Sequence, residues 1–229
     1  MIVSHRHRFI FIKTRKTAST SIEIALSQFC GPEDIITPIH PDDEAIRRSL
    51  EYPGPQNFLM PPSSYARSDW LRFIASGRRK RFVNHASAAY VESHVPSQVW
   101  RDYFTFSVER DPFDKAVSRY FWSTRDPRPS INEFLHNVPA SVLSNWHLYT
   151  RNDHIHVDAL VRFEHLDDDL RLIAERLSLP HELRLPRAKS GYRRDRRHYS
   201  CLLDSQARAR VETVCAKEIA AFGYRWNDG

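Results

Sequence analysis

Short apolar runs rich in β-branched residues alternate along the chain with segments whose apolar residues recur every three to four positions. The stretch 7–13 (HRFIFIK) is typical of a buried strand, and 21–29 (SIEIALSQF) has helical spacing. The same order recurs at 104–110 (FTFSVER) and 111–124 (DPFDKAVSRYFWST). Strands are also predicted at the N-terminus, at 80–86 (KRFVNHA) and at 159–163. This alternation predicts an α/β fold whose central parallel sheet is flanked by helices, with ligands at the carboxyl ends of the strands.

The remaining segments predict further helices and one irregular insert. Helical spacing is present at 43–50, at 68–76 with Ser68 as the N-cap, and at 95–103, 131–138, 140–150, 167–179 and about 203–223. Residues 31–68 carry many of the 14 prolines and predict a proline-rich excursion that walls a binding cleft. The length of 229 residues suits a single domain spanning 1–229.

Composition indicates which kind of ligand and which cellular compartment suit the protein. The net charge of +6 comes from 34 basic and 28 acidic residues, a mild excess that favours an anionic ligand and is small for a nucleic-acid-binding protein. The three cysteines have neither metal-site nor disulfide spacing, which favours a reducing compartment. Since neither a leader nor a run of about 18 apolar residues is evident, we expect a cytoplasmic protein without a transmembrane segment.

The first candidate site lies where the strand at 7–13 gives way to the helix at 21–29. Residues 13–21 hold three cations and five hydroxyls but no glycine. A helix N-terminus presents unpaired N–H groups and partial positive charge, so this loop predicts a phosphate cradle with Lys16 as its cation. The alternative is a polar turn capped by Thr20 or Ser21 that binds no ligand.

The second candidate site follows the strand at 104–110. Arg110 ends this strand, and Ser118 lies eight positions later, about two helical turns along, so both fall on one face. An arginine fork and a hydroxyl on one face predict a grip for a second phosphate. The alternative is that Arg110 pairs with Asp111 or Asp114 and that Ser118 only packs.

These two segments, in this order, resemble the PAPS-dependent sulfotransferases. KTASTS (16–21) is similar to the 5′-phosphosulfate loop P-K-T-G-G-[ST]-[ST], and RDPFDKAVSRY (110–120) to the 3′-phosphate motif R-[DN]-P-x-x-R-x-x-S-x-Y. The resemblance is closest to the Golgi-type carbohydrate sulfotransferases and their bacterial relatives. It extends over the C-terminal half, from VRFEHLDDDL to EIAAFGYRW. Arg15 stands in place of the motif's proline, Ala18 and Ser19 in place of its glycines, and Lys115 in place of its second arginine.

The resemblance implies a P-loop-like three-layer fold and PAPS (3′-phosphoadenosine 5′-phosphosulfate) as co-substrate, with no metal. Lys16 would stabilise the leaving group during in-line transfer. The loop residues that would bind PAPS are Arg15, Lys16, Thr17, Ala18, Ser19, Thr20 and Ser21, and of these Thr17 to Ser21 would hold the 5′-phosphate. Arg110 and Ser118 would hold the 3′-phosphate. The basic loop 189–198 would close over the adenosine, with Tyr192, Arg193, Arg194 and Arg196 as candidates and Tyr192 or Tyr199 stacking on adenine.

The resemblance also implies an acceptor hydroxyl, on a carbohydrate or glycolipid, in a bacterial enzyme that acts on a soluble acceptor or at a membrane surface. His85, predicted at the carboxyl end of the strand 80–86, is the first candidate for the general base. Glu23, just inside the first helix, is the second. Trp100, Trp122 and Trp146 are expected in the core.

Two other functional classes fit part of the pattern. A P-loop nucleotide or small-molecule kinase would use the same loop position with ATP and magnesium, but the sequence lacks G-x-x-x-x-G-K-[ST]. A non-catalytic anion- or RNA-binding module would use the basic loop but would leave Arg110 and Ser118 without a role.

Overall fold

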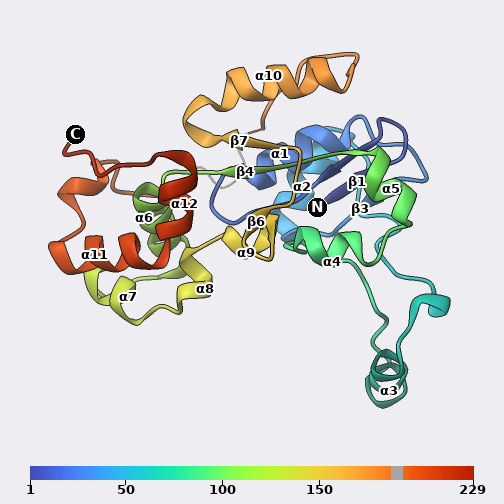
Figure 1. The fold of residues 1–229 in the computed structure, drawn as a ribbon, viewed down its shortest axis with the longest axis horizontal. Coiled ribbons are helices and arrows are strands. Elements are labelled where there is room, and N and C mark those ends of the chain that lie inside the picture. The colour runs from blue at the N-terminus through green and yellow to red at the C-terminus, as the bar shows by residue number, and fades with distance from the viewer. Residues whose placement is uncertain (187–192) are drawn as a thin grey trace.

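The computed structural model describes residues 1–186 and 193–229. In these residues a five-stranded sheet has the order β3-β1-β2-β4-β7 (Figure 1). Its strands are β1 (Ile2–Ser4), β2 (Phe9–Phe11), β3 (Ile35–Ile36), β4 (Phe104–Glu109) and β7 (Ala159–Arg162). A separate two-stranded sheet consists of β5 (Thr150–Arg151) and β6 (His154–Ile155).

The sheet is mixed, which corrects the expectation of a parallel one. β2 pairs with β4 and β4 with β7 in parallel, but β1 is antiparallel to both β2 and β3. Only residues 5–8 separate β1 from β2, and a parallel crossover needs about a dozen residues. The predicted strand at 80–86 is also wrong, because Arg81 forms only an isolated bridge with Leu59.

The helices match most of the predicted segments. They are α1 (Ser19–Ser27), α2 (Pro41–Ser49), α3 (Arg67–Ser76), α4 (Ala88–Glu92), α5 (Ser97–Asp102), α6 (Pro112–Ser123), α7 (Ile131–Asn137), α8 (Ala140–Leu143), α9 (Trp146–Tyr149), α10 (Leu166–Arg176), α11 (Ser205–Val214) and α12 (Ala216–Phe222). Short 3₁₀ helices cover Pro62–Ser64, Phe163–His165 and Tyr199–Cys201. Three expectations are corrected: 140–150 forms two helices, the C-terminal helix breaks at Cys215, and Ala66 rather than Ser68 is the N-cap of α3.

Helices cover both faces of the sheet, as expected. Successive residues of a strand point to opposite faces. Phe9 and Phe11 pack with α1 and α10, whereas Ile10 and Ile12 pack with Phe82 and with residues of α4 and α5. The sheet is therefore the middle of three layers.

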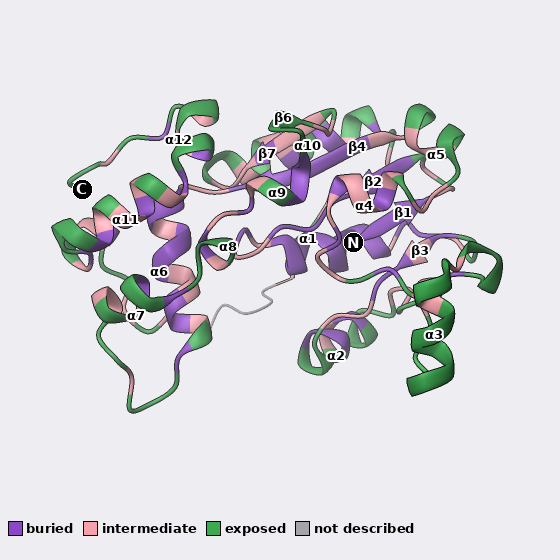
Figure 2. Cartoon of the chain, turned by 60° about the horizontal axis from the view of Figure 1, so that its bottom comes forward, coloured by how far each residue is buried: buried purple, intermediate pink, exposed green. Residues whose placement is uncertain are grey.

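A second, helical core surrounds α6. Phe113 and Val117 of α6 pack against α7, α8 and α11 (Figure 1). Figure 2 shows buried residues concentrated on the sheet, α1 and α6, whereas α3 is exposed along its length. In the described part of the chain, no helix has both the length and the apolar content to cross a bilayer.

Candidate functional site

The loops that follow β2 and β4 leave the same edge of the sheet, because these strands are parallel neighbours with Phe11 opposite Phe106. Both loops border one cavity of about 490 Å³. The described residues that line it are Thr14, Arg15, Lys16, Thr17, Ala18, Ser19, Thr20, Ser21, His85, Arg110, Ser118, Arg119, Trp122, Phe163 and Arg193. The structure therefore brings together both candidate anion grips and His85.

The loop between β2 and α1 makes its tight turn without glycine. Lys16 and Ala18 have φ angles of 63° and 57°, in the left-handed region. Each such residue costs roughly 1–2 kcal/mol when it carries a Cβ. Position 18 is one where the resembling motif has glycine, which adopts positive φ angles without this strain.

Internal hydrogen bonds hold this loop and use some of its hydroxyls. Thr14 Oγ1 donates its proton to the Val108 carbonyl. Thr14 Oγ1 is therefore the acceptor in its bond with Thr17 Oγ1, 2.8 Å away. Ser19 Oγ donates to the Thr14 carbonyl. Thr17 and Ser19 therefore support the loop's shape with their hydroxyls, while Thr20 and Ser21 are the other two hydroxyls at the start of α1.

Asn145, between α8 and α9, connects the loop to the helical core through hydrogen bonds. It accepts from the Arg15 N–H at 3.1 Å and donates to the Arg15 carbonyl at 3.0 Å. Glu218 of α12 in turn accepts from the Asn145 N–H at 3.0 Å. Arg15 also donates through Nη1 to the Ser141 carbonyl. The loop is thus positioned by residues more than a hundred positions away in the sequence.

The N-terminus of α1 opens onto the cavity. Ala18 occupies the N-cap position and provides no side-chain cap, and Ser19, Thr20 and Ser21 of the first turn line the cavity. The first N–H groups of a helix have no partner within it and carry partial positive charge. This end of α1 is therefore suited to a phosphate group.

Arg110 links the two loops. Its Nη1 donates to the Lys16 carbonyl at 3.2 Å, its Nε donates to Asp114 Oδ2 at 2.8 Å, and its guanidinium lies 3.9 Å from the centre of the Phe163 ring. Arg193 pairs with the other oxygen of Asp114. Burial alone would raise the pKa of Asp114, but Arg110 and then Arg193 lower it. Arg110 does pair with Asp114, yet it lines the cavity together with Ser118.

Arg119, Trp122 and Phe163 also line the cavity, although the sequence did not indicate them. Lys16 Nζ lies 5.3 Å from the centre of the Trp122 ring, and the Arg119 guanidinium lies 5.0 Å from it. The expectation that Trp122 belongs to the core is wrong, since it is half-buried at the cavity wall. Its spacing of four from Ser118 places both on one face of α6, a signal that could have identified it.

His85 lies in a turn before α4 rather than at a strand end. Its Nδ1 is 3.0 Å from the Lys13 carbonyl, an acceptor, so Nδ1 carries the proton and Nε2 has the lone pair. Burial, followed by the charge of Lys13, lowers the pKa of His85 to about 3. The imidazole is therefore neutral near pH 7, and this low pKa makes it a weak base in the absence of a ligand.

Glu23 is fully buried and is not among the described residues that line the cavity. Its Oε2 lies 2.6 Å from Lys13 Nζ, and its Oε1 accepts from Thr37 Oγ1 and faces Arg47. Burial alone would raise the pKa of Glu23, but the surrounding cations, Lys13 first, lower it to about 2. The geometry thus favours His85 over Glu23 as a base that reaches a ligand.

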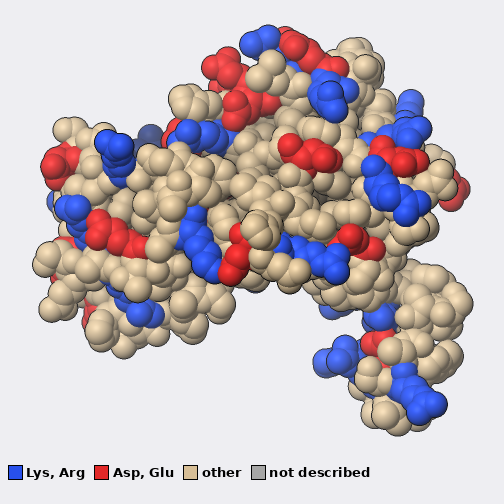
Figure 3. All heavy atoms as spheres, in the orientation of Figure 1, with Lys and Arg blue, Asp and Glu red and all other residues tan. Residues whose placement is uncertain are grey.

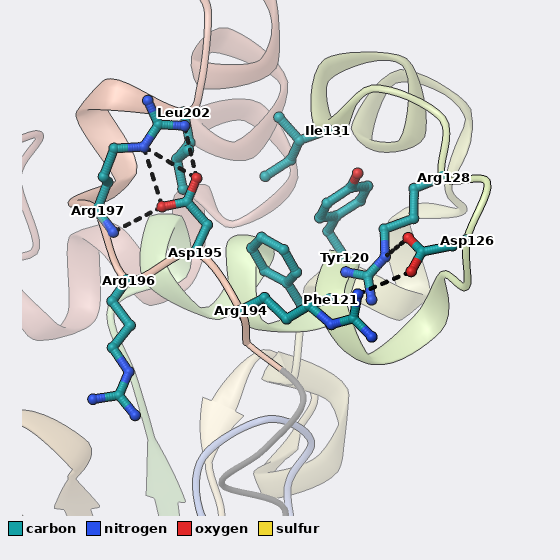
Figure 4. A pocket seen from close by; sticks show the side chains of 10 residues that line it. All are labelled: Tyr120, Phe121, Asp126, Arg128, Ile131, Arg194, Asp195, Arg196, Arg197 and Leu202. Atoms are coloured by element: carbon teal, nitrogen blue, oxygen red, sulfur yellow. Dashed lines mark hydrogen bonds and ion pairs between the residues drawn. The ribbon is translucent and has the colours of Figure 1, made fainter.

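The described residues of the basic loop line more than one cavity. Arg193 lines the cavity described above, and with Arg196 it lines a neighbouring one of about 550 Å³ beside Asp114. Arg194 and Arg196 line another of about 700 Å³, beside α6 (Figure 4). There Arg194 pairs with Asp126 at 3.0 Å. Tyr192 lies outside the described residues. Tyr199 is buried and stacks on Phe113 with ring centres 5.4 Å apart.

Lys115, which stands where the resembling motif has arginine, points into the protein. It is buried, and its Nζ lies 2.7 Å from Glu109 Oε1 and 3.8 Å from Glu218. Burial alone would lower the pKa of Lys115, but the carboxylates, Glu109 first, raise it. Lys115 therefore joins β4, α6 and α12 and is not part of the described cavity lining.

Comparisons with known proteins add little. No family model matches the chain, and no solved structure matches it. The chain is similar to an uncharacterized protein of the archaeon Archaeoglobus fulgidus, with 29% identity over 99 residues, which cover 41% of this chain and 82% of the relative. A function can therefore be proposed only from the geometry of the cavity.

Proposed function

We propose that the protein is a PAPS-dependent sulfotransferase that moves a sulfuryl group to a hydroxyl of a carbohydrate or glycolipid. One observation supports the proposal: the two loops with candidate anion grips border a single cavity and are joined by the hydrogen bond from Arg110 Nη1 to the Lys16 carbonyl, at 3.2 Å. A nucleotide with phosphates at both its 5′ and 3′ positions needs two such grips side by side. A single grip would serve an ordinary nucleotide equally well.

The residues of the cavity divide between the two phosphates. Thr20, Ser21 and the N-terminus of α1 suit the 5′-phosphate, with Lys16 as its cation. Arg110, Ser118 and Arg193 suit the 3′-phosphate. Because Asp114 already holds Arg110 and Arg193, both guanidinium groups are positioned before a ligand binds, which reduces the entropy lost on binding.

Proton transfer from the acceptor hydroxyl is assigned to His85. The bond from Nδ1–H to the Lys13 carbonyl fixes the ring and leaves Nε2 to take the proton. The donor supplies the sulfuryl group, whose bond to the 5′-phosphate oxygen breaks as a bond to the acceptor oxygen forms. Lys16 balances the negative charge that remains on that phosphate. The nearby anion would also raise the low pKa of His85.

Ligand-dependent thermal stability tests the proposal. Adenosine 3′,5′-bisphosphate at a hundredfold excess over its Kd should add about 2.7 kcal/mol to the unfolding free energy, without magnesium. For a domain of this size the melting temperature should then rise by roughly 5–10 °C. Stabilisation only by ATP with magnesium would indicate a kinase instead, and stabilisation only by an oligonucleotide would indicate a nucleic-acid binder. Transfer of labelled sulfate to sugar acceptors then tests turnover.

A further inference from the structure

Residues 61–81 form an arm that projects from the body of the protein (Figure 1). Both ends of the arm are anchored, since Met60 and Phe82 are buried in the core on either side of it. The two chain segments at its base are joined by hydrogen bonds from the Met60 N–H to the Lys80 carbonyl and from the Phe82 N–H to the Phe58 carbonyl. The arm carries α3, none of whose residues is buried.

The arm has an internal structure of its own. The Tyr65 ring packs on Trp70 and Phe73, with ring centres 5.3 and 6.4 Å apart. The Lys80 N–H donates to the Tyr65 hydroxyl at 2.9 Å, and Lys80 Nζ pairs with Asp69 at 2.8 Å. These contacts occupy one face of α3 and fix its orientation on the arm.

The other face of α3 presents apolar side chains to solvent. Leu71 is 69% exposed and Ile74 is 78% exposed, and their spacing of three places them side by side. Trp70 and Phe73 beside them are also partly exposed. Contiguous apolar surface on a projecting helix marks an interaction site rather than a core element.

The arm also carries most of the protein's excess charge. Between residues 66 and 81 six basic residues accompany the single acidic Asp69, a net charge of +5 out of +6 for the whole chain. Since Lys80 pairs with Asp69, the five arginines provide the excess, and all five are exposed. Figure 3 shows this protrusion with several basic side chains and little acidic surface. The five are Arg67, Arg72, Arg78, Arg79 and Arg81.

We propose that the arm docks on an anionic lipid bilayer, with Leu71 and Ile74 in the headgroup–acyl boundary and the arginines among the lipid phosphates. An exposed apolar face surrounded by basic residues is the pattern of helices that lie in the membrane interface. A second copy of the chain fits less well, because two identical arms of charge +5 would face each other. This inference stands independently of the proposed sulfotransferase activity.

Vesicle co-sedimentation of the full chain tests this inference. The protein should sediment with phosphatidylcholine vesicles that contain phosphatidylserine, but not with pure phosphatidylcholine, and added salt should release it. The double variants Leu71→Ser/Ile74→Ser and Arg78→Gln/Arg79→Gln should each lower the partition coefficient at least about tenfold. The matched controls Leu172→Ser and Arg171→Gln/Arg208→Gln, exposed residues outside the arm, should retain binding.

Each of the following results would overturn the proposal. Equal binding to neutral and anionic vesicles would show that the arm does not recognise lipid charge. Equal binding by the parent protein and by arm variants with unchanged melting temperatures would show that the arm has no role in binding. A dimer that dissociates in Leu71→Ser/Ile74→Ser, without vesicle binding by the parent protein, would make a second copy the occupant. Retention of oligonucleotides but not vesicles would identify a nucleic-acid surface.

Discussion

Replacing Arg110 with alanine separates the two proposed phosphate grips. The side chain contributes an Nε bond to Asp114, an Nη1 bond to the Lys16 carbonyl and a stacking contact with Phe163. A hydrogen bond to a charged group contributes about 1.5–3 kcal/mol. With Arg193 still present at Asp114, we expect Arg110→Ala to weaken the binding of adenosine 3′,5′-bisphosphate by about 2–3 kcal/mol, or roughly 30- to 150-fold in Kd.

The ligand lacking the 3′-phosphate provides the matched control. Adenosine 5′-monophosphate has no 3′-phosphate for Arg110 to hold, so its affinity should fall less than that of the bisphosphate, through the lost Arg110 bond to the Lys16 carbonyl alone. Isothermal titration calorimetry of both ligands against parent and variant gives the difference directly. Equal losses for the two ligands would show general damage to the cavity, and an unchanged bisphosphate Kd would refute the assignment of Arg110.

Three further outcomes are expected. Lys16→Ala should lower the sulfuryl-transfer rate by about 10²–10³, because it removes the cation at the leaving phosphate; Lys217→Ala, exposed on α12, is the control for labelled-donor assays. His85→Ala should lower turnover by about 10²–10⁴ with unchanged bisphosphate affinity, whereas His154→Ala, exposed on β6, should have no effect. The pKa of His85, lowered from 6.5 to about 3, means that its contribution to stability is complete above pH 6.5 and is lost on acidification. Chemical denaturation should therefore show that the unfolding free energy of His85→Gln falls by about 3 kcal/mol less than that of the parent between neutral pH and about pH 4. Parallel pH profiles of the two proteins would contradict this.

The sequence predicted the sheet's centre better than its edge. The apolar runs at Phe9 to Ile12 and in 104–109 were visible because each strand is buried on both faces between helices. The direction of β1 could have been inferred from the short connection to β2, but apolar pattern alone carries no direction. The failure at 80–86 has another cause: Phe82 is buried as the anchor of the arm, and Lys80 and Arg81 before it belong to the arm rather than to the sheet.

The cavity lining was predictable for the charged residues that come directly after a strand. Lys16 and Arg110 follow β2 and β4, and parallel neighbours place such residues together. The hydrogen bonds between Asn145 and Arg15 could not be predicted, because the two residues are 130 positions apart in the sequence. The burial of Glu23 is likewise a tertiary effect, since its place in the first turns of α1 looked suitable for a ligand. Arg194, which pairs with Asp126 beside α6, shows that the side chains of a basic run do not all reach the same cavity.

Asn145 donates to Glu218 and is hydrogen-bonded to the backbone of Arg15, so the loop before α1 and helix α12 depend on each other. A chain emerging from the ribosome presents every residue of the KTASTS segment early, yet the loop lacks this set of hydrogen bonds until residue 218 has left the exit tunnel. Nucleotide capture should then come late in biosynthesis. Fragments that stop before α12 should keep both sequence motifs but bind adenosine bisphosphate poorly.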